Sequence, residues 1–544
     1  MTIHARIGRV GSQRITVFSG LSDVLADRGF LPGGGLAAAK IPLGVTVRHL
    51  ALVDDPSLPL PPYALLVVRE VEANVSAHID DGLTSDERTQ RRAEAERLRT
   101  QRQVEADLGG FDVDAEWVEE IERNDFLTVD QAVGGCPPAT VEMCEVWLVR
   151  PGTWEVLDKH ALGEYEHGMS LNVLPLTTEA EGKTGMQTNS TLFVVVGTGI
   201  VDQDGEDIGS KGRVLLFEVK KPKENVNAAS PLSLSLTYSK DILLGPVTVL
   251  EGLKTGNQTR LVIGAGAEVT VEQWKDQQLT QIGFFHAQMQ VQGVTMFKTF
   301  MLLSDAYDSI HFLVWRESDK SLTLLAKDYE PTCVYAAGFI NRGPTMYFVC
   351  HDDRENLQFF QYAPTDPASR GGNKLVCRAD YHLGTQTTHL RTHLVRNSLL
   401  LGSATPATSW IALRHRDAMA LRQEDPDCRR FGVHFGTVDG GFGAVFPVNE
   451  RTFRRLYALQ GVVGNALQQS GALNVRGWRL FQRTTQRGAC RSGERQKGVL
   501  DGGLLMRYCQ LGYFQQEEIA RAIGTTVDMI MDNLLELDCA RMVL

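Results

Sequence analysis

Short apolar segments recur along the first 448 residues, and each is followed by a turn-forming segment and a second apolar segment. Apolar runs of about four to eight residues bounded by Gly, Asp or Ser are typical of β-strands, and two such runs joined by a turn predict a β-hairpin. Seven hairpins are predicted: YALLVVRE with CEVWLVRP, LFVVVGTG with GRVLLFEV, RLVIGAGA with EVTVEQW, TFMLLSDA with SIHFLVWR, MYFVCHDD with NLQFFQYA, SLLLGSAT with SWIALRHR, and GVHFGTVD with GFGAVFPV.

The spacing of these hairpins predicts a β-propeller. Antiparallel units that repeat every 40 to 50 residues or so are typical of propeller blades, and a blade needs neighbours to bury both faces of its sheet. The Trp-Asp dipeptide of WD40 repeats is missing. We therefore expect a mainly β fold with a seven-bladed, non-WD40 propeller over residues 1–448.

A charged insertion interrupts the first hairpin within residues 80–135. Between Asp86 and Asp107 it carries six arginines and six carboxylates. Balanced charges pair with each other and with water, so this segment is a poor phosphate clamp. We expect a solvated helix or loop here.

The apolar pattern changes to a helical period after Val448. Asn449 is placed to cap a helix and Gly471 to stop it. Large apolar residues recur near one face of this helix: Phe453, Leu456, Leu459, Val463 and Leu467. Two or three further helices are expected before Leu544, which predicts a small α-helical C-terminal domain over residues 449–544.

The segment RAIGTTVDMIMDNLLEL (521–537) has the outline of a helix-turn-helix with its turn at Gly524. A helix that reads DNA needs Lys or Arg toward the phosphates, but residues 525–537 contain no basic residue. We therefore predict a structural helix pair, capped by Thr525. Its second helix should expose an acidic stripe, Asp528, Asp532 and Glu536, and bury Val527, Ile530, Met531, Leu534 and Leu535.

Composition narrows the class of protein. Hydrophobic residues make up 43% and charged residues 22% of the 544, which is typical of soluble globular domains. Nine cysteines without a CxxC pair favour a reducing compartment over a disulfide framework or a zinc site. We expect an intracellular protein without a signal peptide or membrane association.

One stretch is strongly basic although the chain has a net charge of −11. Between residues 451 and 497 a single carboxylate, Glu494, opposes ten basic side chains: Arg451, Arg454, Arg455, Arg476, Arg479, Arg483, Arg487, Arg491, Arg495 and Lys497. Arginine matches phosphate oxygens bidentately, so these residues are candidates for binding RNA or an acidic protein partner. The alternative is that they coat solvated helix faces or pair with acidic propeller loops.

The sequence motifs that would indicate catalysis, cofactor binding or metal binding are incomplete or absent. EGKT resembles a phosphate-binding loop, but the Gly required five positions before Gly182 is Thr177, and GxSxG and HExxH are absent. DQDGED has Asp207 and Arg213 where a calcium loop needs Gly and Glu. His389 and His393, with His382 nearby, are expected on a strand and not in a metal site. We predict that the chain is not an enzyme and binds no cofactor.

Four tail segments, PVNERTFRRLYALQ, GALNVRGWRLFQR, GVLDGGLLMRYCQL and EIARAIGTTVDMIMDNLLELD, resemble the C-terminal end of the largest subunit of the cleavage and polyadenylation specificity factor. Upstream, KIPLG, VVVGTGIVDQDGEDIGSKGRVLLFEV, GPVTVL, FKTFMLLSDAYDSIHFLVW and HFGTVDGGFGAVFPV follow in the order that this family shows. The resemblance covers nearly all of the chain outside the charged insertion and corresponds to the last third of a typical member.

The resemblance implies a nuclear scaffold subunit of the pre-mRNA 3′-end cleavage and polyadenylation complex. It implies two partners, a zinc-finger subunit together with a WD-repeat subunit, which make most contacts with the polyadenylation signal. Pre-mRNA would be contacted through them, or directly by the basic stretch.

Two relatives of this family are alternatives, because they share the propeller and the helical tail. One is the large subunit of the damaged-DNA-binding complex, an adaptor for a ubiquitin ligase, and the other is a splicing factor 3b subunit. TFRRLYALQ followed by LNVRGWR favours polyadenylation.

Overall fold

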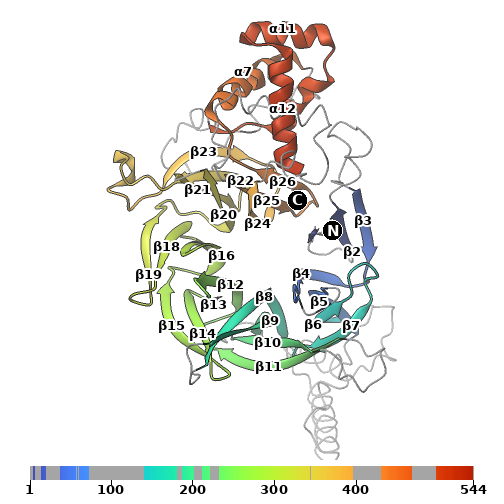
Figure 1. Cartoon of the computed structure of the whole chain (residues 1–544), viewed down its shortest axis with the longest axis vertical. Helices are drawn as coiled ribbons and strands as arrows, with labels where there is room; N and C mark the ends of the chain where they lie inside the picture. The colour runs from blue at the N-terminus through green and yellow to red at the C-terminus, as the bar shows by residue number, and fades with distance from the viewer. Residues whose placement is uncertain are drawn as a thin grey trace, which may run out of the picture. The chain divides into compact units, whose positions relative to one another are not determined.

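The chain is mainly β, with its longer helices confined to the C-terminal part of the described residues (Figure 1). A computed structural model describes residues 4–6, 14–19, 37–56, 58, 61–72, 140–163, 165–180, 187–200, 211–220, 232–342, 345–395, 430–467, 479 and 498–542. Residues Arg69–Met143 form a unit apart from the rest of the chain. The charged insertion predicted at residues 80–135 lies outside the described residues.

Antiparallel sheets follow one another along the chain, and within each four-stranded sheet every strand pairs with the next in sequence. Among the described residues, four sheets have four strands each. The first two are β4 (Thr46–Leu52), β5 (Tyr63–Glu72), β6 (Thr140–Val149) and β7 (Val156–Ala161), then β8 (Glu166–Ala180), β9 (Gln187–Ile200), β10 (Gly212–Lys220) and β11 (Ser233–Ile242). The next two are β12 (Val247–Thr255), β13 (Gln258–Ala265), β14 (Glu268–Lys275) and β15 (Gln278–His286), then β16 (Val291–Phe297), β17 (Phe300–Asp305), β18 (Ile310–Arg316) and β19 (Ser321–Lys327).

Two further sheets complete the described β structure. One has three strands: β1 (His4–Arg6), β2 (Arg14–Ser19) and β3 (Ala37–Pro42). The other contains β20 (Val334–Arg342), β21 (Thr345–Asp352), β22 (Asn356–Gln361), β23 (Val376–His382), β24 (Thr387–Val395), β25 (Arg430–Thr437) and β26 (Phe442–Val445). In it, β20–β23 form one meander and β24–β26 another, and the two are joined where β20 pairs with β25.

The central hairpin of each four-stranded sheet and two hairpins of the β20–β26 sheet were predictable from the sequence. Six of the seven predicted hairpins are confirmed, as β5–β6, β9–β10, β13–β14, β17–β18, β21–β22 and β25–β26. The seventh, over residues 398–416, lies outside the described residues. The outer strands were missed because their half-exposed faces mix polar and apolar residues, as in SLSLTYSKDI of β11.

The large apolar cores lie between neighbouring sheets. In one of them, Phe193 and Leu216 of the β8–β11 sheet pack with Ile263 and Trp274 of the next sheet. The rings of Phe193 and Trp274 meet edge to face with centroids 5.3 Å apart. Similar cores join the other consecutive sheets from β4–β7 to β20–β23, and another joins the β20–β23 and β24–β26 meanders. The sheets β8–β11, β12–β15 and β16–β19 therefore bury both faces against neighbours, as a propeller blade must.

Polar side chains also join the first strands of consecutive sheets. The Ser170 hydroxyl on β8 donates to the Val247 carbonyl on β12 at 2.9 Å. Thr248 on β12 donates to the Val291 carbonyl on β16, and Thr295 on β16 donates to the Ala337 carbonyl on β20, both at 2.7 Å. Side chain-to-backbone bonds of this kind fix how each sheet meets the next.

The predicted fold class is confirmed as mainly β, whereas the predicted number of seven propeller blades stays a prediction.

The C-terminal helices share a core of their own. They are α7 (Glu450–Ala466), α10 (Gly502–Met506), the 3-10 turn η5 (Arg507–Gln510), α11 (Tyr513–Ile523) and α12 (Val527–Met542). Leu456, Leu459 and Val463 of α7 are fully buried, as their spacing predicts. Asn449 caps α7 by accepting a hydrogen bond from the Arg451 amide. No helix among the described residues is long and apolar enough to cross a bilayer.

Helices α11 and α12 are joined by a tight turn. Gly524 ends α11 with a φ of 79°, a left-handed conformation that suits glycine. The predicted cap and one predicted buried residue were wrong. The hydroxyl that reaches the first turn of α12 belongs to Thr526, which accepts from the Met529 amide, and not to Thr525. Met531 is exposed, because the buried face runs through Ile530 and Leu534.

Replacing Thr295 by Val should lower the free energy of unfolding by about 1–2 kcal/mol, since the shape is kept while the Ala337 carbonyl loses its donor. Thr237→Val is the matched control, because Thr237 is an exposed residue of the outer strand β11. Urea unfolding of both variants measures the difference. Equal effects at the two sites would contradict a role for these bonds in joining sheets.

Candidate partner and nucleic-acid interface

The structure describes four of the ten basic residues predicted to bind RNA or a partner. Arg451, Arg454 and Arg455 lie on α7, and Arg479 lies in the segment between α7 and α10. The other six lie outside the described residues: Arg476, Arg483, Arg487, Arg491, Arg495 and Lys497.

The three arginines of α7 point in different directions. Arg451 is exposed. Arg454 is also exposed and pairs with Glu450 one helical turn away. Arg455 is half-buried and donates from Nη1 to the Asn533 side chain on α12 at 2.7 Å. Helix α7 thus presents Arg451 and Arg454 to solvent and uses Arg455 to hold α12.

Arg479 fixes its segment to strand β23. Its Nη1 donates to the carbonyls of His382 and Leu383 at 3.2 and 2.9 Å. Its own carbonyl accepts from the His382 amide at 3.1 Å. The guanidinium lies over the Tyr381 ring, 4.9 Å from the centroid. The planar fork of Arg suits this combined stacking and hydrogen bonding.

Asp501 completes this junction. Its Oδ2 accepts from Arg479 Nε at 3.2 Å, and its Oδ1 accepts from the Leu504 amide and so caps α10. Its backbone amide donates to the Gln460 side chain on α7 at 2.9 Å. Burial, with the Asp501 carboxylate adding to it, strongly raises the pKa of the Tyr381 hydroxyl. Strand β23, α7 and α10 therefore meet at one charged and largely buried contact.

A second ion pair ties the helices to the sheet. Arg430 at the start of β25 lies 3.4 Å from the Glu536 carboxylate on α12, and both side chains are largely buried. Glu536 was expected in an exposed acidic stripe. That expectation was wrong for Glu536, whereas Asp528 is exposed and Asp532 is half-exposed.

Sequence reasoning missed the structural roles of Arg479 and Glu536. The segment GWRLF places Arg479 between Trp478 and Leu480, and such an apolar context indicates burial. That signal could have identified the contact. For Glu536, helical spacing from Asp528 pointed to solvent, and only the fold shows that this residue of α12 pairs with Arg430 at the start of β25.

The weaker motifs have structural explanations where the structure describes them. EGKT (181–184) lies outside the described residues, but Thr177, five residues before its glycine, lies in β8, and the Thr177 hydroxyl donates to the Thr259 carbonyl. Arg213 of the candidate calcium loop pairs with Glu166. His389 and His393 lie on β24, as expected, and no group of three or more His, Cys, Asp or Glu side chains in the described part could hold a metal ion.

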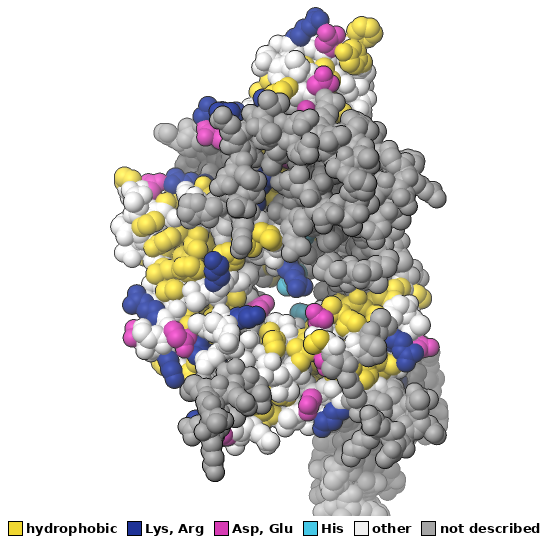
Figure 2. All heavy atoms as spheres, viewed as in Figure 1, with side chains coloured by type: hydrophobic (Ala, Val, Ile, Leu, Met, Phe, Trp, Pro, Cys, Tyr) yellow, Lys and Arg dark blue, Asp and Glu magenta, His cyan; other side chains and the backbone are white. Residues whose placement is uncertain are grey.

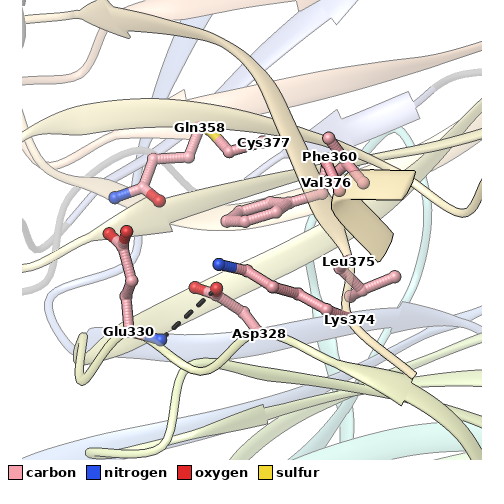
Figure 3. A pocket seen from close by; sticks show the side chains of 9 residues that line it. Asp328, Glu330, Gln358, Phe360, Lys374, Leu375, Val376 and Cys377 are labelled. Atoms are coloured by element: carbon pink, nitrogen blue, oxygen red, sulfur yellow. Dashed lines mark hydrogen bonds between the residues drawn. The ribbon is translucent and has the colours of Figure 1, made fainter. Parts of the chain in front are cut away.

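A pocket of about 170 Å³ lies beside the connection from β19 to β20. Figure 3 shows four polar side chains converging near the ring of Phe360: Asp328, Glu330, Gln358 and Lys374. Burial raises the pKa of Asp328 to about 6, and the Ser309 hydroxyl, a donor at 3.0 Å, opposes this rise. The volume is below the several hundred Å³ typical of small-molecule sites.

Basic side chains of the described residues do not gather on the face seen in Figure 2. Lys and Arg are scattered there among acidic and apolar groups. Phosphate binding relies on clustered positive charge. On this face the described residues therefore present no basic surface large enough to follow a nucleic-acid backbone.

Comparison with protein-family models identifies one matching family. A family model described as the CPSF A subunit region matches residues 144–510. This range runs from β6 to the end of η5, so it includes both the sheets and the contact made by Arg479.

Curated relatives carry matching names. The cleavage and polyadenylation specificity factor subunit 1 of Arabidopsis thaliana is 32% identical over 404 residues, which cover 73% of this chain and 25% of the relative. The Drosophila melanogaster protein of that name is 24% identical over 397 residues, with coverage of 72% and 25%. Protein cft1 of Schizosaccharomyces pombe is 26% identical over 392 residues, again with 72% and 25%. The chain thus spans about a quarter of the length of these relatives.

Replacing Arg479 by Ala should lower the free energy of unfolding by roughly 2–4 kcal/mol, because Asp501 and two carbonyls lose a charged donor. Arg479→Lys should fall between Ala and wild type. Arg454→Ala, which removes an exposed pair, should cost no more than about 0.5 kcal/mol. Urea unfolding, with limited proteolysis of the C-terminal helices, measures the effect. Equal losses for Arg479→Ala and Arg454→Ala would contradict the assignment.

Asp328→Asn should stabilise the protein at pH 7. Because the folded pKa of about 6 exceeds the ordinary value of 3.8, the favourable contribution of this carboxyl is present below pH 3.8 and is lost as pH rises through 6. The neutral amide avoids that loss, worth roughly 2–3 kcal/mol. Urea unfolding at pH 4 and pH 7 tests this, with the exposed Asp319→Asn as control. Destabilisation at pH 7 would refute it.

Proposed function

This chain belongs to the CPSF A subunit family, and from that premise we propose that it is a non-catalytic scaffold in pre-mRNA 3′-end cleavage and polyadenylation. In this proposal it acts in the nucleus and supports recognition of the polyadenylation signal through protein partners. The expected partners are a zinc-finger subunit together with a WD-repeat subunit. The observation that carries the proposal is the family match over residues 144–510.

The physical character of the described residues supports a scaffold. Each sheet shares a core with its neighbours, and the helices share a core of their own. Arg479 and Arg430 connect the helices to the sheets through largely buried contacts. A surface held in this way changes little when a partner binds, which lowers the entropic cost of association.

Direct RNA contact is a second candidate, because the stretch from 451 to 497 carries ten basic residues against one acid. Arg451 and Arg454 are exposed on α7 and available to a ligand. Arg479 is the weaker candidate, since its guanidinium is already engaged with Asp501 and β23. The RNA contact is therefore assigned to the arginines of this stretch other than Arg455 and Arg479.

An adaptor in damaged-DNA binding or ubiquitin ligation, or a splicing factor 3b-type scaffold, is the alternative for the same fold. The relatives from Arabidopsis and Drosophila are named as cleavage and polyadenylation specificity factor subunits. That naming favours 3′-end processing over these alternatives.

Affinity capture from nuclear extract, with and without ribonuclease, tests the proposal. The tagged chain should recover polyadenylation subunits, and ribonuclease should leave them bound because the contacts are between proteins. Recovery of cullin-ligase or splicing components alone would contradict the proposal.

The same capture experiment, done with a variant chain, distinguishes direct RNA contact from RNA that is held through protein partners. Arg483→Gln with Arg487→Gln should retain the protein partners but lose co-purified RNA, and the salt slope of RNA binding should fall by about 1.4 for two lost phosphate contacts. An unchanged slope would leave these arginines as surface residues.

A further inference from the structure

Large apolar side chains stand exposed on neighbouring loops of four consecutive sheets. We call these five residues the apolar strip: Leu243 (77% exposed), Leu244 (56%), Met289 (58%), Tyr307 (60%) and Tyr335 (42%). They lie in the β11–β12, β15–β16 and β17–β18 connections and at the start of β20. In a four-stranded meander, the turn between strands two and three and the connection leaving strand four lie at the same end of the sheet. The strip therefore lies along one end of these sheets.

A single buried carboxylate joins the middle of the strip. Asp305 is fully buried at the end of β17. Its Oδ2 accepts from the Met289 amide at 3.1 Å, and its Oδ1 accepts from the Tyr307 amide at 2.9 Å. The Tyr307 carbonyl accepts from the Thr332 amide at 2.9 Å, which connects the loop that leads to Tyr335.

Gly266 joins the other end of the strip to Met289. Its φ is 55°, and the Leu244 carbonyl fills the space that a Cβ would need. The Gly266 carbonyl accepts from the Val291 amide at 2.8 Å, two residues beyond Met289. The loops that carry Leu244, Met289 and Tyr307 are therefore held by hydrogen bonds and close packing, so their apolar side chains are presented in a fixed arrangement.

The surroundings of the strip are acidic. Asp353 is exposed at the neighbouring β21–β22 turn. Burial raises the pKa of the Cys333 thiol near Tyr335, and the carboxylates of Asp353, Asp305 and Asp352 raise it further. Lys327 lies nearby but pairs with Asp308 at 2.9 Å. The exposed carboxylate of Asp353, beside Arg354 in the same turn, is therefore the acidic group that a cationic side chain docking next to the strip would meet.

We propose that the apolar strip binds a segment of another protein that carries apolar side chains together with Lys or Arg. Exposed apolar surface held in a fixed arrangement is a mark of protein interfaces, and the carboxylates select a basic occupant. This assignment does not depend on a role in 3′-end processing. It concerns the sheets and not the basic stretch of the helical part.

Fluorescence anisotropy with two labelled amphipathic peptides, one of Leu and Lys and one of Leu and Glu, tests the proposal on the full chain. The chain should bind the Lys peptide at least about tenfold more tightly, because opposite charges meet. Met289→Ser with Tyr307→Ser should weaken this binding by roughly fivefold or more, since two central contacts are lost. The backbone bonds to Asp305 do not depend on either side chain, so the thermal midpoint should not change.

Phe284→Ser with Leu324→Ser is the matched control, because both residues are exposed but lie on the outer strands β15 and β19. This variant should bind like wild type. The proposal is overturned by equal affinity for the two peptides, by no binding of either, or by equal loss in both variants. Sedimentation that shows a dimer lost only in the strip variant would assign the strip to a second copy of the chain. If the strip variant loses binding of a labelled RNA but keeps binding of the peptide, the strip would be assigned to nucleic acid.

Discussion

Contact between consecutive sheets is the constraint on which the described β structure depends. Among the described residues, the sheets β8–β11, β12–β15 and β16–β19 have two apolar faces, and each face packs against the sheet before or after it. The hydroxyls of Ser170, Thr248 and Thr295 add direction to this contact, because each must meet a carbonyl on the first strand of the next sheet. Apolar burial supplies most of the stabilisation, and the hydrogen bonds set the register between sheets.

The C-terminal helices extend this principle with charge. Arg479 lies between α7 and α10 and Glu536 lies on α12, and both are engaged at contacts with the last sheet. Breaking such a buried pair leaves an uncompensated charge, so these contacts fix where the helices dock. The family match over residues 144–510 includes the Arg479–Asp501 contact, so the matched region contains both sheets and helices.

The sequence predicts best those elements whose environment is uniform. Central strands such as β9 and β10 are buried on both faces and appear as continuous apolar runs, and Leu456, Leu459 and Val463 keep a simple helical period. Outer strands are half-exposed and lose that signal. A charge count also cannot show which arginine a fold uses internally, so Arg479 was grouped with the candidate RNA ligands. Met289 and Tyr307 look ordinary in sequence, because only the fold brings their loops to one buried carboxylate.

The central claim is that the sheets and the C-terminal helices form one cooperative platform for partners. Native-state hydrogen exchange of the full chain tests it directly, because it reports the free energy at which each element opens. The account predicts that the most protected amides of β20–β23, α7 and α12 open with the same free energy and respond equally to denaturant. Helices that open at a much lower free energy than the sheet they contact would contradict it.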